Sequence, residues 1–326
     1  MYEKDRTLLL VATASALPNN LSCKLLDPSR ISEAVGVIHG GYINVIPFRS
    51  VDSTSQYIPC TDSSERYSAA VQQVMWCYLN FEACLVVASN VGLQVFDCSS
   101  LSLRFSHPCK DSPGGREHFA RGLANPPGDY LCVGNNSGVV RLFGMSDDGG
   151  MIFIDRKQAH SSPIADLACS KEMMASCDDA GIIVLWSITP DEMIHWAEIT
   201  SYGSACTSVE VWRGLVVAAY GSGHIRIFSV DHRRREVTLS IEIAAHAKWI
   251  TALDIAPESG LVLSVSEDSF AKVWQISGTP DNVVVVHRFS SQVKDCMLVG
   301  GRFLTLSGSL FAVSIYDSNL VQCFKM

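Results

Sequence analysis

Two segments of the sequence carry a histidine, a serine and an aspartate in the same order, each set followed by a tryptophan. The sets are His160, Ser176, Asp179 and Trp186, and then His246, Ser264, Asp268 and Trp274. Ser266 is an alternative hydroxyl in the second set. Serine, histidine and aspartate together can supply the nucleophile, the base and the orienting acid of a hydrolase, so these sets are the first candidates for chemistry.

The sequence around both serines argues against a nucleophile. Ser176 lies in the run MASC and Ser264 in the run LVLSVS, which have the apolar character of buried strands. A nucleophilic hydroxyl needs exposure and an adjacent oxyanion hole. No phosphate-binding loop, G-x-S-x-G, H-E-x-x-H or dinucleotide motif occurs in the chain. We therefore expect a protein that is not an enzyme, with no catalytic residue and no cofactor site.

The elements that position these residues have the pattern of short β-strands. The runs VVRLF (139–143), IRIF (225–228), AKVW (271–274) and VSIY (313–316) are rich in β-branched residues and end in an aromatic ring. Another apolar run precedes each of them, separated by turn-forming Gly, Ser, Asn or Asp. Each pair of runs therefore predicts a hairpin.

The aromatic strand ends recur at a regular spacing. They are Phe48, Phe96, Phe143, Trp186, Phe228, Trp274 and Tyr316, at intervals of 42 to 48 residues. A period of about 40 to 45 residues with short strands is typical of propeller blades. We therefore predict an all-β, single-domain, seven-bladed propeller over residues 1–326. The expected blades are approximately 17–69, 70–115, 116–158, 159–201, 202–245, 246–290 and 291–326.

Closure of such a ring usually combines strands from both ends of the chain. The segment TLLLVATA (7–14) is a spare strand suited to this position, and LVQCFKM (320–326) competes for it. The sequence leaves open which of them closes the ring, or whether both pair there. In the first blade, the Ser-rich segment 50–68 predicts a long loop.

Blades four and six carry enough detail to suggest a family. Residues 158–188 and 244–276 resemble the WD40 consensus, with the two His, Ser, Asp and Trp sets in the consensus order. The resemblance implies that each set is a structural tetrad, in which the indole N–H donates to the hydroxyl and the imidazole links hydroxyl to carboxylate. It also implies a cytoplasmic, non-catalytic scaffold or adaptor that binds other proteins or peptides.

The candidate partner-binding surface is the narrower face of the propeller, formed by loops that enter the innermost strands and by turns between the middle strands. Lys248 and Trp249 follow the histidine of blade six at such a position, and Glu267 should lie nearby. Tryptophan is enriched at binding hot spots. The alternative is that Trp249 packs between neighbouring blades, and the sequence does not distinguish the two.

A second hypothesis is a substrate receptor or adaptor subunit of a ubiquitin ligase. Some WD40 proteins dock through an apolar-Asp-x-Arg motif after the third strand, and Val230-Asp231-His232-Arg233 has that composition. It lies two residues beyond the register that Phe228 sets. The scaffold therefore remains the preferred hypothesis.

Composition excludes several other classes. A net charge of −8 with scattered Lys and Arg argues against nucleic acid as a partner. Twelve irregularly spaced cysteines without a C-x-x-C pair indicate buried free thiols in a reducing compartment and no metal site. No apolar run reaches the length of a membrane span, so we expect no membrane insertion. The run 8–16 only partly matches a signal peptide, because no net positive charge precedes it.

Overall fold

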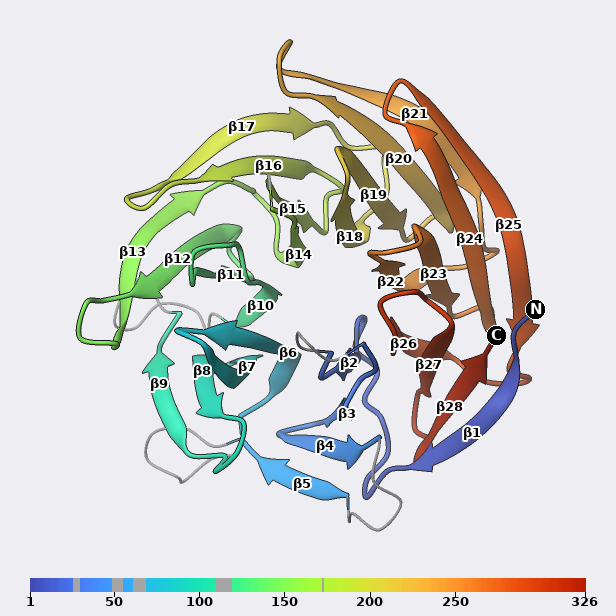
Figure 1. Cartoon of the computed structure of the whole chain (residues 1–326), viewed down its shortest axis with the longest axis horizontal. Coiled ribbons are helices and arrows are strands. Elements are labelled where there is room, and N and C mark those ends of the chain that lie inside the picture. Colours follow the sequence, from blue (N-terminus) through green and yellow to red (C-terminus); the bar gives the residue numbers. More distant parts are fainter. Residues whose placement is uncertain (26–29, 49–54, 61–68, 110–118, 172) are drawn as a thin grey trace.

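The computed structural model describes residues 1–25, 30–48, 55–60, 69–109, 119–171 and 173–326. Its strands form seven four-stranded antiparallel sheets around a central channel (Figure 1). The described residues contain strands and turns but no helix. The predicted seven-bladed propeller is therefore confirmed.

The strands of blades one to six run in chain order from the channel to the rim (Figure 1). Blade one contains β2 (Leu21–Cys23), β3 (Ala34–His39), β4 (Tyr42–Pro47) and β5 (Gln56–Pro59), and blade two contains β6 (Val71–Leu79), β7 (Glu82–Ser89), β8 (Gly92–Asp97) and β9 (Leu103–His107). Blade three contains β10 (Ala120–Ala124), β11 (Leu131–Asn135), β12 (Val139–Met145) and β13 (Met151–Gln158), and blade four contains β14 (Ile164–Cys169), β15 (Met174–Asp178), β16 (Ile183–Ile188) and β17 (Met193–Ile199). Blade five contains β18 (Cys206–Trp212), β19 (Leu215–Tyr220), β20 (His224–Asp231) and β21 (Glu236–Ala244), and blade six contains β22 (Ile250–Ala256), β23 (Leu261–Ser266), β24 (Phe270–Thr279) and β25 (Asn282–Gln292).

Blade seven joins the two ends of the chain. It contains β26 (Leu298–Phe303), β27 (Leu310–Ile315), β28 (Leu320–Lys325) and, at the rim, β1 (Glu3–Leu9). β1 pairs antiparallel with β28, from Glu3 opposite Lys325 to Leu9 opposite Leu320. The closing strand thus begins four residues before the expected segment 7–14 and shares only residues 7–9 with it. Residues 320–325 occupy the third position instead of competing for the outer one.

The position of Tyr316 differs from the sequence-based expectation. Tyr316 follows β27, the second strand of blade seven, and its side chain is exposed. The buried aromatic on the third strand is Phe324. The run VSIY has the composition of a third strand, and only its pairing with β26 and β28 reveals its true place. Of the predicted Ser-rich loop, residues 55–60 contain β5, and the other residues lie outside the described part of the chain.

The core consists of apolar layers between neighbouring blades. One layer combines Ala175 and Leu185 of blade four with Val209 and Tyr220 of blade five, all buried. Burial of a side chain the size of Val209 or Leu185 stabilises the fold by roughly 1.5–3 kcal/mol. The twelve cysteines have free thiols, and several lie in these layers, for example Cys177.

The ring has two faces that differ in their connections. We call one the Trp249 face: it contains the loops that lead into each first strand and the turns between second and third strands. In blades two to seven, a backbone hydrogen bond joins this turn to the loop that enters the same blade, as from Gly221 N–H to Ala205 C=O and from Glu267 N–H to Trp249 C=O. We call the other the Phe81 face: it contains the turns between first and second strands, including Phe81.

Tyr2 provides a test of ring closure, because it packs just before β1 against blades six and seven. Its ring lies 5.3 Å from that of Phe289 and 5.0 Å from that of Phe311, and its hydroxyl donates to the carbonyl of Gly308. Tyr2→Ala should lower the free energy of unfolding by about 3 kcal/mol, and Tyr2→Phe by about 1 kcal/mol. Urea denaturation measures both. Leu9→Ala, at an exposed position of β1, is the control, and equal effects of Tyr2→Ala and Leu9→Ala would contradict this role.

Candidate functional site

The structure brings together the four residues expected in the blade-six tetrad. The indole N–H of Trp274 donates to Ser264 Oγ at 3.1 Å, and that oxygen lies 2.8 Å from His246 Nε2. His246 Nδ1 lies 3.0 Å from an oxygen of Asp268. The alternative hydroxyl, Ser266, instead accepts the N–H of Asp268. The chain of hydrogen bonds links the loop before β22 to β23, to the following turn and to β24.

The protonation of this set follows from its burial. Desolvation lowers the pKa of His246, although Asp268 opposes the shift. Burial would raise the pKa of Asp268, but hydrogen bonds from His246 and from the Ala247 N–H outweigh it and hold that pKa well below its ordinary value. The set therefore contains a carboxylate and a neutral imidazole, each with its polar atoms satisfied.

Blade four forms the same chain of hydrogen bonds, but with a different aspartate. His160 Nδ1 lies 3.0 Å from Asp178 Oδ2, while Nε2 lies 2.7 Å from Ser176 Oγ, which also accepts the Trp186 indole N–H at 2.9 Å. The assignment of Asp179 was wrong. Its carboxylate lies 3.5 Å from Arg121 and is 40% exposed.

Asp178 replaces Asp179 in the tetrad because the aspartates of the two blades start from different backbone positions. Asp178 lies opposite Ile164 in the sheet, where blade six has Ser266 opposite Ile250. A carboxylate on the strand itself therefore reaches the imidazole in blade four, whereas Asp268 reaches it from the turn. Asp178 also accepts the N–H groups of Ala180 and Ile182, which fixes the turn.

The blade-six tetrad holds the loop that carries Lys248 and Trp249. Asp268 accepts the Ala247 N–H at 3.0 Å, and Ser266 Oγ donates to the Lys248 carbonyl at 3.4 Å. Asp268 of the tetrad and the neighbouring Ser266 thereby fix the backbone around the exposed Lys248. Glu267 lies half-buried in the adjoining turn.

Trp249 is both packed and exposed. Its ring lies on Gly221 of blade five so closely that a Cβ atom there would come within 2.6 Å of the indole. The side chain nevertheless remains 38% exposed. The packing expected from the sequence and the exposure needed for a binding site thus both occur at Trp249.

Two further exposed aromatic residues on the Trp249 face were missed by sequence reasoning. Tyr202 is 40% exposed, and the guanidinium of Arg226 lies 4.3 Å from the centre of its ring. Tyr316 is 47% exposed in the turn after β27. The position of Tyr202 in the repeat could have identified it, because it precedes the first strand of blade five as Trp249 precedes that of blade six.

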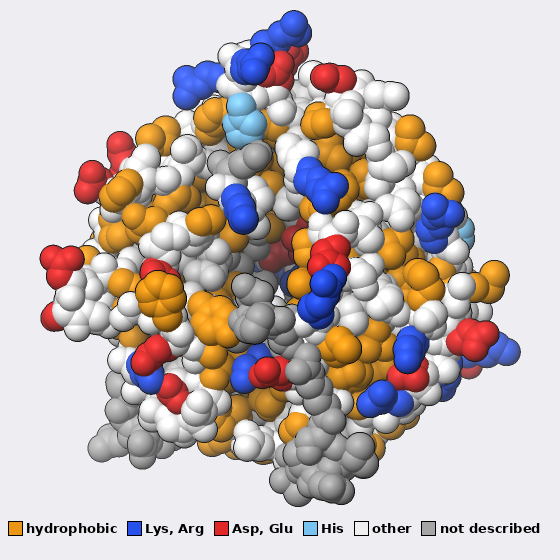
Figure 2. All heavy atoms as spheres, in the orientation of Figure 1, with side chains coloured by type: hydrophobic (Ala, Val, Ile, Leu, Met, Phe, Trp, Pro, Cys, Tyr) orange, Lys and Arg blue, Asp and Glu red, His pale blue; other side chains and the backbone are white. Residues whose placement is uncertain are grey.

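The channel contains a second candidate site, a cavity of about 330 Å³ near the Phe81 face. Its lining includes Asn125, Pro257 and Leu306 from connections between first and second strands. Figure 2 shows the centre of the ring hollowed, with acidic and basic side chains inside. The cavity is thus at the opposite end of the channel from Trp249.

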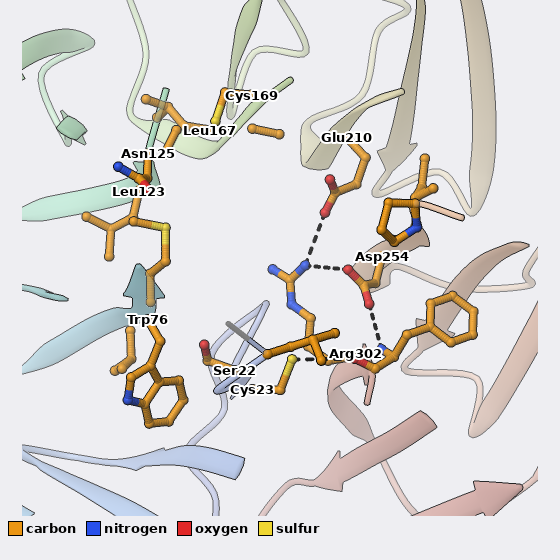
Figure 3. A pocket seen from close by; sticks show the side chains of 18 of the residues that line it. Ser22, Cys23, Trp76, Leu123, Asn125, Leu167, Cys169, Glu210, Asp254 and Arg302 are labelled. Atoms are coloured by element: carbon orange, nitrogen blue, oxygen red, sulfur yellow. Dashed lines mark hydrogen bonds and ion pairs between the residues drawn. The ribbon is translucent and has the colours of Figure 1, made fainter. Parts of the chain in front are cut away.

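A charged cluster forms one wall of this cavity (Figure 3). Arg302 Nη1 lies 3.1 Å from Glu210 Oε1 and 2.8 Å from Asp254 Oδ1, and the Phe303 N–H donates to Asp254 at 2.6 Å. These three charged residues occupy equivalent positions in β18, β22 and β26, with sequence spacings of 44 and 48 residues. The spacing of the repeat was therefore the signal that could have found them. The cluster braces the inner strands of blades five, six and seven.

Burial changes the protonation of the acidic groups in this cluster. Burial raises the pKa of Glu210 to about 8, against the opposing effect of Arg302, and burial also raises the pKa of Asp254. Cys23 lines the same cavity, and burial raises the pKa of its thiol to about 12, so it remains protonated. No group of three His, Cys, Asp or Glu within the described ranges could hold a metal ion.

Adjacent aspartates in blade four allow a matched test of the tetrad. Asp178→Ala leaves the buried His160 without its acceptor and should lower the free energy of unfolding by about 3 kcal/mol. Asp179→Ala removes only an exposed ion pair and should cost about 0.5 kcal/mol or less. Urea denaturation of both variants measures the difference. Equal stability of the two variants would mean that the tetrad does not stabilise the blade.

The raised pKa of Glu210 predicts a pH-dependent contribution to stability. In the unfolded chain this carboxyl ionises above its ordinary value near 4.5, whereas in the folded chain it keeps its proton until about 8. Folding stability should therefore fall as pH rises through this window. Glu210→Gln removes this pH dependence. The melting temperature of the variant minus that of wild type should therefore increase from pH 4.5 to 8.5. Glu236→Gln, on an exposed strand, is the control, and a constant difference for Glu210→Gln would refute the shift.

Comparison with known proteins identifies the family of the chain. A solved structure, a chain of the mitotic checkpoint complex, superposes with a TM-score of 0.76 over 99% of this chain and 91% of that chain, at 16% identity, which shows the fold alone. The WD repeat-containing protein 54 of Homo sapiens is 32% identical over 100% of this chain and 99% of its own length. The Mus musculus protein is 31% identical over 97% of both.

Sequence features also agree with this family. The two strong blades among degenerate ones, with NNLS near the start and AHAKWITALDIA late in the chain, resemble WD repeat-containing protein 54. The family model of WDR54 matches residues 1–326, which confirms that resemblance. The chain therefore belongs to the WDR54 family.

Proposed function

We propose that this chain is a non-catalytic scaffold that binds a protein or peptide partner through the Trp249 face, around Trp249 and Tyr202. WD40 propellers in general serve as platforms for protein interactions, and the family membership supports this class of function. The observation that carries the proposal is Trp249 itself. It is held in place by a tetrad-anchored loop, rests on Gly221 and keeps 38% of its surface exposed.

The surroundings of Trp249 fit an amphipathic partner segment. Lys248 is exposed beside it, Glu267 lies in the bonded turn, and Tyr202 lies at the loop that enters the neighbouring blade. Aromatic side chains on a rigid backbone lose little entropy on binding, so they make effective anchors. We therefore expect an extended peptide or loop that places an apolar side chain against Trp249 and polar groups near Lys248 and Glu267.

A non-catalytic function is supported by the state of the polar groups. The hydroxyls of Ser176 and Ser264 are buried and engaged in their tetrads. Arg302 is shared between the side chains of Glu210 and Asp254 in the channel. These arrangements match structural roles, and we propose that the chain carries out no reaction.

The ubiquitin-ligase alternative has weaker support. Val230 is buried at the end of β20, and the carboxylate of Asp231 accepts the N–H groups of Arg233 and Arg234 at 2.8 and 3.1 Å. Asp231 thus has a structural role in a hairpin turn, which accounts for its place in the motif. Arg233 is nevertheless exposed, as a docking residue would need to be. Loss of adaptor binding on Arg233→Ala would favour this alternative over the scaffold.

Several further properties remain proposals. The twelve free thiols support a reducing, cytoplasmic location. The net charge of −8 supports proteins rather than nucleic acid as partners. Within the described residues, no helix is long and apolar enough to cross a membrane.

Exposed aromatic residues on opposite faces give a matched test of the binding surface. Trp249→Ala should remove at least one specific partner from affinity purifications read by quantitative mass spectrometry, with about a tenfold loss of recovery, because hot-spot truncation costs at least about 1–2 kcal/mol. Phe81→Ala, which truncates a 92% exposed ring on the other face, should leave recovery unchanged. Circular dichroism confirms folding of both. An unchanged partner list for folded Trp249→Ala would reject the proposed surface.

A further inference from the structure

The outer strand of blade six has an open edge. β25 is eleven residues long, the longest strand in the described part of the chain, and there it pairs with β24 alone. It lies at the outer rim of the ring (Figure 1). A strand with one neighbour presents half of its backbone N–H and C=O groups to whatever lies beyond it.

Four of the other outer strands carry features that discourage pairing, whereas β9 (Leu103–His107) and β17 (Met193–Ile199) resemble β25 in carrying one charged residue each but are shorter, at five and seven residues. β1 has four charged residues in seven, β13 has three in eight and β21 has two in nine. β5 has only four residues and ends in Pro59. β25 has one charged residue, Arg288, in eleven. Charges, prolines and short length are the common protections of exposed strand edges.

The unprotected part of β25 is also apolar. Residues 283–286 are four consecutive valines, and Val284 and Val286 are 45% and 43% exposed. Val283 and Val285 pack instead against the layer between blades five and six. A valine-rich, uncharged segment on an open edge has a strong tendency to pair with another strand.

We propose that β25 pairs with β25 of a second copy of this chain, antiparallel and centred on Val285. A two-fold axis at that residue places Val284 opposite Val286 of the partner subunit, and the same contact occurs twice. Val283 then faces His287 of the partner subunit, and Asn282 faces Arg288 of the partner subunit. No two like charges meet, so the segment is complementary to itself.

This pairing is independent of the proposed binding surface. Trp249 lies before the first strand of blade six, beside the channel, whereas β25 is the fourth strand at the rim. The dimer would therefore present two copies of the Trp249 face. Because each copy carries a net charge of −8, added salt should strengthen the dimer by screening repulsion.

Substitutions at the two exposed valines test the register. In the full chain, V284K/V286K places lysine opposite lysine twice and should raise the dimer dissociation constant at least about tenfold. V284K/V286E places lysine opposite glutamate twice and should restore dimerisation to within about threefold of wild type. Analytical ultracentrifugation over a concentration series measures all three proteins, and circular dichroism confirms that they remain folded.

A charge on another outer strand is the control for this register. L239K places a charge at an exposed position of β21, on the rim of blade five, and should leave dimerisation unchanged. A wild-type chain that is monomeric at every concentration would overturn the proposal. Equal weakening by the lysine pair and the lysine–glutamate pair would also overturn it, because facing pairs would then not occur.

Discussion

The structure depends on one constraint: each four-stranded sheet has two apolar faces, and both must be covered. A single blade cannot cover itself, so each blade buries its faces only against its two neighbours. The ring therefore holds together only if it closes. Here the closure is made by β1 beside β28, with Tyr2 buried between Phe289 and Phe311.

Within this ring, the polar sets of blades four and six add specificity to apolar packing. Both link an imidazole to a hydroxyl, an indole and a carboxylate, although Asp178 and Asp268 start from different backbone positions. Each tetrad therefore needs a carboxylate beside the imidazole, but the backbone position that supplies this carboxylate can vary. In blade six the same carboxylate fixes the backbone that carries Lys248 and Trp249. The loop proposed to bind partners therefore depends on the same hydrogen bonds that stabilise blade six.

The sequence was sufficient for the fold, because the repeat places an aromatic residue within or directly after the third strand in six blades. It also identified seven of the eight tetrad residues. It failed at Asp179 because neighbouring aspartates have the same composition, and only side-chain direction decides which reaches His160. It failed at Tyr316 because a second strand with β-branched residues resembles a third strand.

The channel cluster could not be found as a local motif. Glu210, Asp254 and Arg302 lie one to a blade and meet only when blades five, six and seven pack side by side. The open edge of β25 was hidden for a similar reason. Four valines in a row indicate a strand, but only the sheet order shows that the strand has no neighbour on its outer side among the described residues.

We propose that partners bind the Trp249 face through the tetrad-anchored loop of blade six and the adjoining loop and turn of blade five. Hydrogen–deuterium exchange of the affinity-purified assembly, compared with the chain alone, tests it most directly. The account predicts new protection in residues 201–205, 221–224 and 245–250, with the turns of the Phe81 face unchanged. Protection confined to the Phe81 face, with none in those three segments, would contradict it.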